Sequence, residues 1–379
     1  MQVINGTPYV VNSTQANDKK GDVHLLVVAK ATYDFPEVND EPLKLSDIQR
    51  TVYDDDLFEG APGVSTPYFE SNWSYNKPLC DILVKATGYP PEGHESETLS
   101  VGFEVGTCHK KVWIQGQQQW QKNSMGKLVL TPKQELTSTP ITYSRSYGGS
   151  WLADEKQDDS FNAFFLYNPV GSGFAEKQHR LHLEGKTAPN IFPDESVMNA
   201  SKAFKPVSFG PLGRHWLPRS QYAGTYDQNW IDNVYPKWPA DLDERYFQAA
   251  PEDQQIAYPS GEEKVVLSNM HPSRSLIEFA LPKKTTLPII ALMEDRTVVT
   301  LPTVIDTLEI DADAQQISIV WRAKLPLKRS LREVNTLALG KICKRWWRSH
   351  VFGAGDCGCG GIETDDKDLV VVTEAMELT

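Results

Sequence analysis

Proline and glycine interrupt the chain along its whole length, and the apolar segments between them are short. Of 379 residues, 25 are proline and 25 are glycine. Because these residues break regular structure and favour turns, the spacing is typical of β-strands joined by turns. Residues 23–35 (VHLLVVAKATYDF) begin as a continuous apolar run and end in alternation, as a buried strand does. We therefore expect a mainly β protein with antiparallel, sandwich-like lobes.

One hairpin is predicted in detail. Residues 98–120 (TLSVGFEVGTCHKKVWIQGQQQW) contain two apolar stretches with a break near Gly106 to Lys110. Later in the chain, residues 263–282, 288–311 and 315–326 repeat the strand pattern, with a turn expected between Asp311 and Ala314.

The chain exceeds the length at which one hydrophobic core usually stops growing, so two closely associated lobes are expected. Five regions follow from the patterns: an N-terminal antiparallel β lobe (1–150), an aromatic and proline-rich bridging region packed on the lobes (151–260), a second β region (261–327), a basic helix (328–350) and a flexible glycine, cysteine and acidic tail (351–379). The helix is predicted from an apolar stripe formed by Leu331, Val334, Leu337, Leu339 and Ile342.

Charge and composition exclude several classes of protein. The net charge of −12 argues against a protein that coats nucleic acid, which needs a basic face. The N-terminus lacks the pattern of a secretory signal, and no apolar run is long enough to span a bilayer. We expect a cytoplasmic protein without nucleic-acid or membrane partners.

The five cysteines do not form a disulfide framework, and no cofactor or metal is predicted. Cys357 and Cys359 stand one residue apart in GDCGCGG, where a metal site and a flexible linker both fit the residues.

The stretch 213–230 (GRHWLPRSQYAGTYDQNW) is the densest in aromatic and charged residues and has no helical or strand periodicity. Such a segment is structured by its own side chains, forms a partner-binding face, or carries catalytic groups. If the segment is structured by its own side chains, Asp227 would cap the amides of Asn229 and Trp230. Arg214 and Arg219 would stack on Trp216 or pair with Asp241 and Asp243.

A catalytic interpretation would use the Asp and Trp residues of 214–243 on a carbohydrate, with paired carboxylates as acid and base. No catalytic residue is assigned. The residues chosen as candidates for partner binding are Arg214, Trp216, Arg219, Tyr226, Asp227, Trp230 and, in the basic segment KRWWRSH, Trp346 and Trp347. A solvated basic face remains the alternative for that segment.

Several stretches occur together in a characteristic order. They include KATYDF (30–35), NKPLCDILVKATGYPPEG (76–93), YSRSYGG (143–149), NPVGSGF (168–174), FGPLGRHWLPRSQYAGTYDQNW (209–230) and PADLDERYFQAAPEDQ (239–254). In this combination the chain resembles the bacterial domain-of-unknown-function family 2169 from about residue 20 to about 325.

The resemblance implies a non-enzymatic, cytoplasmic chaperone or adaptor. Members of the family are encoded beside type VI secretion effectors and are thought to load the effector onto the secretion spike, through its tip or PAAR-type region. A carbohydrate-active enzyme and a structural component of the spike are the alternatives. The basic helix and the acidic tail lie outside the resemblance.

Overall fold

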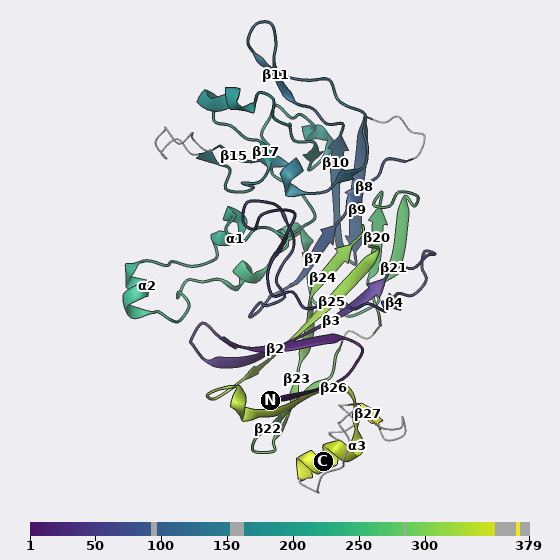
Figure 1. Cartoon of the computed structure of the whole chain (residues 1–379), viewed down its shortest axis with the longest axis vertical. Coiled ribbons are helices and arrows are strands. Elements are labelled where there is room, and N and C mark those ends of the chain that lie inside the picture. The colour runs from purple at the N-terminus through teal and green to yellow at the C-terminus, as the bar shows by residue number, and fades with distance from the viewer. Residues whose placement is uncertain (92–96, 152–162, 284–285, 353–368, 372–379) are drawn as a thin grey trace.

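The protein is mainly β and elongated (Figure 1). The computed structural model describes residues 1–91, 97–151, 163–283, 286–352 and 369–371. Three larger sheets and several two-stranded ribbons account for the strands, and helices are few and short. The mainly β fold expected from the proline and glycine pattern is confirmed.

A seven-stranded sheet forms the centre of the molecule. Its order is β19 (Gln255–Ile256), β7 (Cys80–Lys85), β24 (Thr303–Asp311), β25 (Gln316–Pro326), β3 (Val23–Asp34) and β2 (Val10–Asn17), with β4 (Lys44–Leu45) also paired to β3. The pairs are antiparallel except β7 with β24, which run parallel. The turn expected after Asp311 joins β24 to β25, with Gln315 at a φ of 56°.

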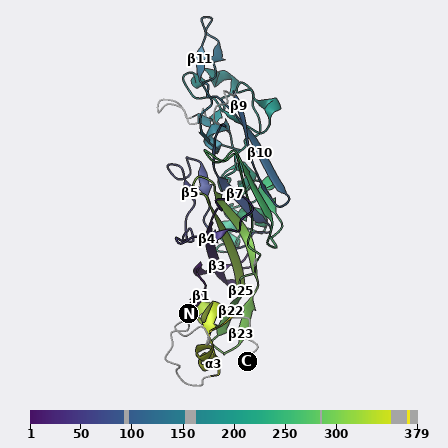
Figure 2. The same ribbon diagram turned by 90° about the vertical axis from the view of Figure 1, so that its right-hand side faces the viewer.

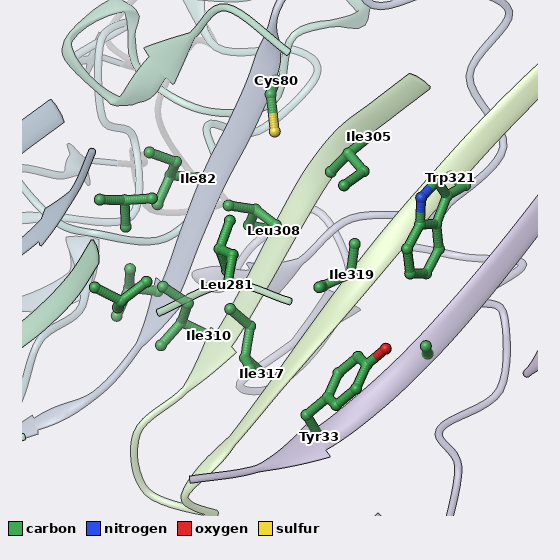
Figure 3. Close-up of a cluster of buried hydrophobic side chains, with 14 of the residues drawn as sticks. Tyr33, Cys80, Ile82, Leu281, Ile305, Leu308, Ile310, Ile317, Ile319 and Trp321 are labelled. Carbon is green, nitrogen blue, oxygen red and sulfur yellow. The ribbon is translucent and has the colours of Figure 1, made fainter. Parts of the chain in front are cut away.

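A second sheet of five strands has the order β18 (Ile191–Phe192), β10 (Cys108–Gln115), β9 (Thr98–Val105), β20 (Lys264–Ser268) and β21 (Leu276–Ala280). The β9–β10 hairpin is the predicted one, and Gly106 takes the positive φ of 56° that its turn requires. Apolar side chains from this sheet and the seven-stranded sheet form one buried core. Figure 3 shows part of it, with Ile82, Leu308 and Ile319 on neighbouring strands.

A third sheet combines strands from early and late in the chain. Its order is β1 (Gln2–Gly6), β26 (Val334–Cys343), β22 (Ile289–Met293) and β23 (Val298–Leu301), with β27 (Leu369–Val371) beside β26. Helix α3 (Lys344–Phe352) follows β26 directly and packs on this sheet. Figure 2 shows α3 at one end of the narrow molecule and β11 at the other.

The helix expected over 328–350 needs correction: residues 334–343 form strand β26, and the helix, α3, begins only at Lys344. Both faces of β26 are apolar, because Leu337 and Leu339 join the main core while Ala338 and Ile342 join a second core under α3. A strand buried on both faces lacks clear alternation, and its apolar residues happened to fit a helical spacing. Gly340, at a φ of +68°, also does not fit a helix.

The sheets do not follow the expected division into lobes. Strand β3 of the N-terminal range pairs with β25, and β9 pairs with β20, so strands from 1–150 and 261–327 share the first and the second sheet.

The remaining elements are short. The ribbons are β5 (Leu57–Phe58) with β6 (Pro67–Phe69), β8 (Thr87–Gly88) with β13 (Thr139–Pro140), β11 (Trp120–Lys122) with β12 (Leu128–Leu130), β14 (Tyr147–Gly148) with β17 (Ser172–Gly173), and β15 (Ser150–Trp151) with β16 (Ala163–Phe164). The bridging region carries α1 (Leu217–Ser220), α2 (Gln228–Asn233) and the 3-10 turns η5 (Glu244–Phe247) and η6 (Glu252–Gln254). Further 3-10 turns are η1 (Tyr143–Arg145), η3 (Lys177–Leu183), η4 (Glu195–Val197) and η7 (Leu331–Glu333).

Candidate functional site

The seven-stranded sheet has one apolar and one polar face, and both are buried. Alternation along β7 and β24 places Ile82, Leu308 and Ile310 in the main core and turns Asp81 and Glu309 to the opposite side. The aromatic-rich segment, which we define as residues 209–254, lies on this polar side, where its backbone and side chains bond to residues of the sheet and of the stretch before β7. Its position therefore depends on buried charges.

Glu70 is the centre of these charges and is almost inaccessible to solvent. Its carboxylate contacts Arg219 Nη2 at 2.6 Å, Arg214 Nη2 at 2.9 Å and Lys77 Nζ at 3.4 Å. Burial alone would raise the pKa of Glu70, but the charges of Arg219, Lys77 and Arg214 outweigh burial and lower this pKa to about 2. We call Glu70, Lys77, Asp81, Arg214 and Arg219 the ion cluster.

Asp81 joins the ion cluster to the far end of the segment. It accepts hydrogen bonds from Lys77 Nζ at 2.7 Å, from Gln248 Nε2 at 2.6 Å and from the Ala249 amide at 2.8 Å. Lys77 also donates to the Thr307 hydroxyl on β24 at 3.1 Å. Both ends of the segment are thus fixed to the same sheet face.

Two of the predicted partner-binding residues, Trp216 and Arg219, are buried in the protein. Arg219 donates to the carbonyl oxygens of Leu212 and Tyr246 at 2.9 Å each, in addition to its bond with Glu70. Trp216 is buried edge-on against Tyr143, with ring centroids 5.1 Å apart. Trp216 and Arg219 therefore hold the segment in place and do not form a surface.

The predicted partners of the two arginines need correction. Arg214 forms a bidentate pair with Asp56, at 2.9 and 3.0 Å, and also contacts Glu70. Neither arginine pairs with Asp241 or Asp243, whose bonds are local. Glu70 and Asp56 were missed because both lie more than 140 residues before their arginines, and no spacing pattern relates such distant positions.

Residues 224–240, which we call the aromatic arm, project from the body of the molecule and carry α2 (Figure 1). Tyr226, Ile231 and Tyr235 are 55%, 55% and 68% exposed. Trp230 lies between the two tyrosine rings, with centroids 4.7 Å from Tyr226 and 5.6 Å from Tyr235. The arm therefore presents an ordered apolar cluster to solvent.

Local hydrogen bonds stiffen the aromatic arm. Asp227 accepts a bond from the Trp230 amide at 2.8 Å, which confirms the predicted cap at that residue. The Trp230 indole donates to the Lys237 carbonyl oxygen at 2.9 Å. At the base, Asp241 accepts bonds from the amide and hydroxyl of Thr225, and Gly224 takes a φ of +85° beside it. The exposed rings are held before any partner binds.

Asp227, Asp241 and Asp243 are the carboxylates that a carbohydrate-active enzyme would use, and their surroundings differ from those of a glycosidase acid. Bonds from Thr225 lower the pKa of Asp241, and bonds from Arg245 lower the pKa of Asp243. A glycosidase acid needs a raised pKa so that it stays protonated at neutral pH. Asp227 serves as the cap of α2. These groups fit turn and cap roles.

A cavity of about 280 Å³ lies between the segment and β10, with walls that include Tyr143, Tyr222 and Val207. Lys110 contributes to it and donates to Asp253 at 2.9 Å and to Gln254 at 2.7 Å. Burial lowers the pKa of Lys110, and Asp253 opposes this effect. The cavity could hold an apolar side chain next to a charged group.

Trp346 and Trp347 lie far from the segment, on α3 (Figure 1). Both are buried in the second core with Ile4, Ile290 and Ile342. The prediction that both lie on a partner-binding face is wrong. Both indoles pack on the third sheet, and the exposed side of α3 carries basic residues. The eight predicted residues therefore do not form one surface.

Among the described residues, no group of three His, Cys, Asp or Glu side chains is placed to hold a metal ion. Cys357 and Cys359 lie outside the described residues. In the same described part of the chain, no helix has the length and apolar character needed to cross a membrane.

Comparison with curated proteins and with solved structures gives no match. A family model does match: it is described as an uncharacterized protein conserved in bacteria (DUF2169), and it covers residues 20–322. This range contains the ion cluster, the aromatic arm and most of the first and second sheets. The chain is therefore a member of the bacterial family DUF2169.

Proposed function

We propose that the protein is a non-enzymatic chaperone and adaptor. It binds a type VI secretion effector in the cytoplasm and assists its loading onto the spike, at the tip or PAAR-type region. This role is the one that resemblance to the family implies. The observation that carries the proposal is the aromatic arm, which exposes three large apolar side chains on a stiffened support.

Exposed apolar clusters of this kind are typical of protein-binding surfaces. Tyrosine and tryptophan are enriched at the centres of interfaces because they bury a large area with few rotatable bonds. Preorganisation also favours binding, since less conformational entropy is lost when the partner arrives. Tyr226, Trp230 and Tyr235 meet both conditions, because their rings already contact one another.

The ion cluster supports the same function indirectly. The aromatic arm has a fixed base, because Arg219 bonds to Glu70 in the stretch before β7 and the Ala249 amide bonds to Asp81 on β7. The charges of the ion cluster are paired with one another.

Co-expression with the effector encoded beside the gene of this protein tests the proposal. We expect the two proteins to co-purify as a complex and the soluble fraction of the effector to rise. An effector that is equally soluble alone and elutes separately would contradict a chaperone role. Recovery of this protein in the secreted material, assembled with the spike, would instead favour a structural component.

A further inference from the structure

Strand β2 is the longest edge strand among the described residues, and one side of its backbone is unpaired. It pairs with β3 from Val10 opposite Lys30 to Asn17 opposite Val23, without a break in register. Within the described ranges, no other segment hydrogen-bonds to the β2 backbone. In an antiparallel edge strand, alternate residues direct their N–H and C=O groups outward. β2 therefore offers a row of free backbone groups.

This edge also lacks the usual protection. Natural proteins guard edge strands with lysine, proline, bulges or a covering loop. The sequence of β2, VVNSTQAN, contains no charged residue, no proline and no glycine. An unprotected edge of this length is a template for pairing with another strand.

The edge strand β21 of the five-stranded sheet shows the contrast. There the loop before β4 covers the edge: the Asp40 amide donates to the Glu278 carbonyl oxygen at 3.0 Å. The Glu278 amide in turn donates to the Asn39 side chain at 3.1 Å. The same chain thus covers one edge and leaves the other open.

Apolar side chains at the β2 edge are covered only in part. Tyr9 and Val11 pack against the main core from one face of the sheet, and both remain half-buried. Val10 and Trp73 pack in the same way against a small cluster on the other face. A strand added to β2 would lie beside Val10 and Val11, so it would gain hydrophobic contacts on both faces of the sheet in addition to backbone hydrogen bonds.

A cleft of about 570 Å³ continues from the Asn17 end of β2. The turn after β2 forms one side, where Lys19 donates to the Leu242 carbonyl oxygen at 3.0 Å. Tyr75, Val234 and Trp238 supply apolar walls from the other side. We call this space the edge cleft; it leads from β2 to the base of the aromatic arm.

We propose that one extended, uncharged segment of the partner protein adds to β2 as a further strand and places an apolar side chain in the edge cleft. The inference rests on the proposed chaperone function, and it names the surface and the chemistry of the segment that is held. β2 lies before the matched range of the family, whereas the apolar walls of the edge cleft lie within it.

A second copy of this chain fits the edge less well. Each copy carries a net charge of −12, which opposes self-association. In an antiparallel β2–β2 pair, the Tyr9 of the second copy would approach the edge cleft. That ring is already stacked on its own Trp321 at 5.5 Å.

The test introduces lysines on the open edge. We expect the double variant Asn12→Lys and Gln15→Lys, at two exposed positions, to weaken binding of the co-expressed effector at least tenfold. Leu276→Lys on the covered edge strand β21 is the matched control and should bind as the wild type does. In the wild-type complex, hydrogen exchange of residues 10–17 should slow relative to the free protein.

Proline variants at Ser13 and Thr14 provide a second test of strand addition, because only one of these two neighbouring amides faces β3. The variant that keeps wild-type thermal unfolding lacks the outward amide and should lose binding. If the effector binds wild type, lysine variants and this proline variant equally, the strand-addition proposal is overturned while the chaperone function stands.

If no effector complex forms with the wild type, the chaperone function fails and the strand-addition proposal fails with it. Light scattering without the effector completes the test. A dimer that the lysine variants dissociate would make a second copy the occupant and would overturn the proposal.

Discussion

Glu70 has three cationic groups around a carboxylate that is buried in the protein. Its folded-state pKa of about 2 lies below its usual value of 4.5. A carboxyl whose pKa is lowered on folding contributes stability above its unfolded pKa, and this contribution is lost as the pH falls toward the folded value. The window for Glu70 is therefore about pH 4.5 to 2.

We expect Glu70→Gln to destabilise the protein by about 3–5 kcal/mol at neutral pH, because it leaves buried cations without their counter-charge. The difference in unfolding free energy between wild type and variant should shrink as the pH falls from 4.5 to 2. Chemical denaturation followed by tryptophan fluorescence across this range measures it. Exposed Glu41→Gln is the control; a difference that stays constant with pH would rule out the assigned role of Glu70.

At the scale of elements, the aromatic arm makes a prediction separate from stability. Replacing Tyr226, Ile231 and Tyr235 together with serine removes the exposed cluster but keeps the Asp227 cap and the Trp230 bond to Lys237. We expect at least tenfold weaker binding of the effector, since a few aromatic residues supply most of the energy of an interface.

The control for the arm replaces three other exposed apolar residues, Ile48, Val64 and Met125, with serine. They are at least as exposed as those of the arm but are not part of it, so binding should not change. Calorimetry with purified effector gives both affinities. Equal loss of affinity in the two triple variants would indicate general surface hydrophobicity and contradict a specific role for the arm.

Elements with a local signal were predictable from the sequence, and those set by distant contacts were not. The β9–β10 hairpin follows from alternation around Gly106, and the cap at Asp227 follows from its position before α2. β26 was mistaken for a helix because β1 and β22 flank it and both of its faces are buried. The partners of Arg214 and Arg219 come from residues 56 and 70, so only the tertiary fold reveals them.

On the scale of the whole molecule, the three sheets share one core. The buried cluster that contains side chains of the first and second sheets also contains Leu337 and Leu339 of β26 and Ile289 of β22. In the third sheet, β26 lies between β1 and β22. The hairpin of β22 and β23 lies within the family range, whereas β1 and β26 lie outside it. The family range and the folding unit are consequently different.

Residues 20–322 alone should therefore fail to fold cooperatively. This fragment lacks β1, β2 and β26, and it ends within β25. It would expose Ile290, because every other buried residue of its cluster, from Ile4 to Trp347, lies outside the fragment. We expect the fragment to be aggregation-prone or to lack near-UV circular dichroism and a sharp thermal transition, because a missing central strand leaves two open edges and an uncovered core.

Residues 1–371, which keep every described strand, should unfold in one sharp transition. If the fragment has the same near-UV spectrum and transition as residues 1–371, the third sheet is an independent addition and the shared core does not determine the stability of the molecule.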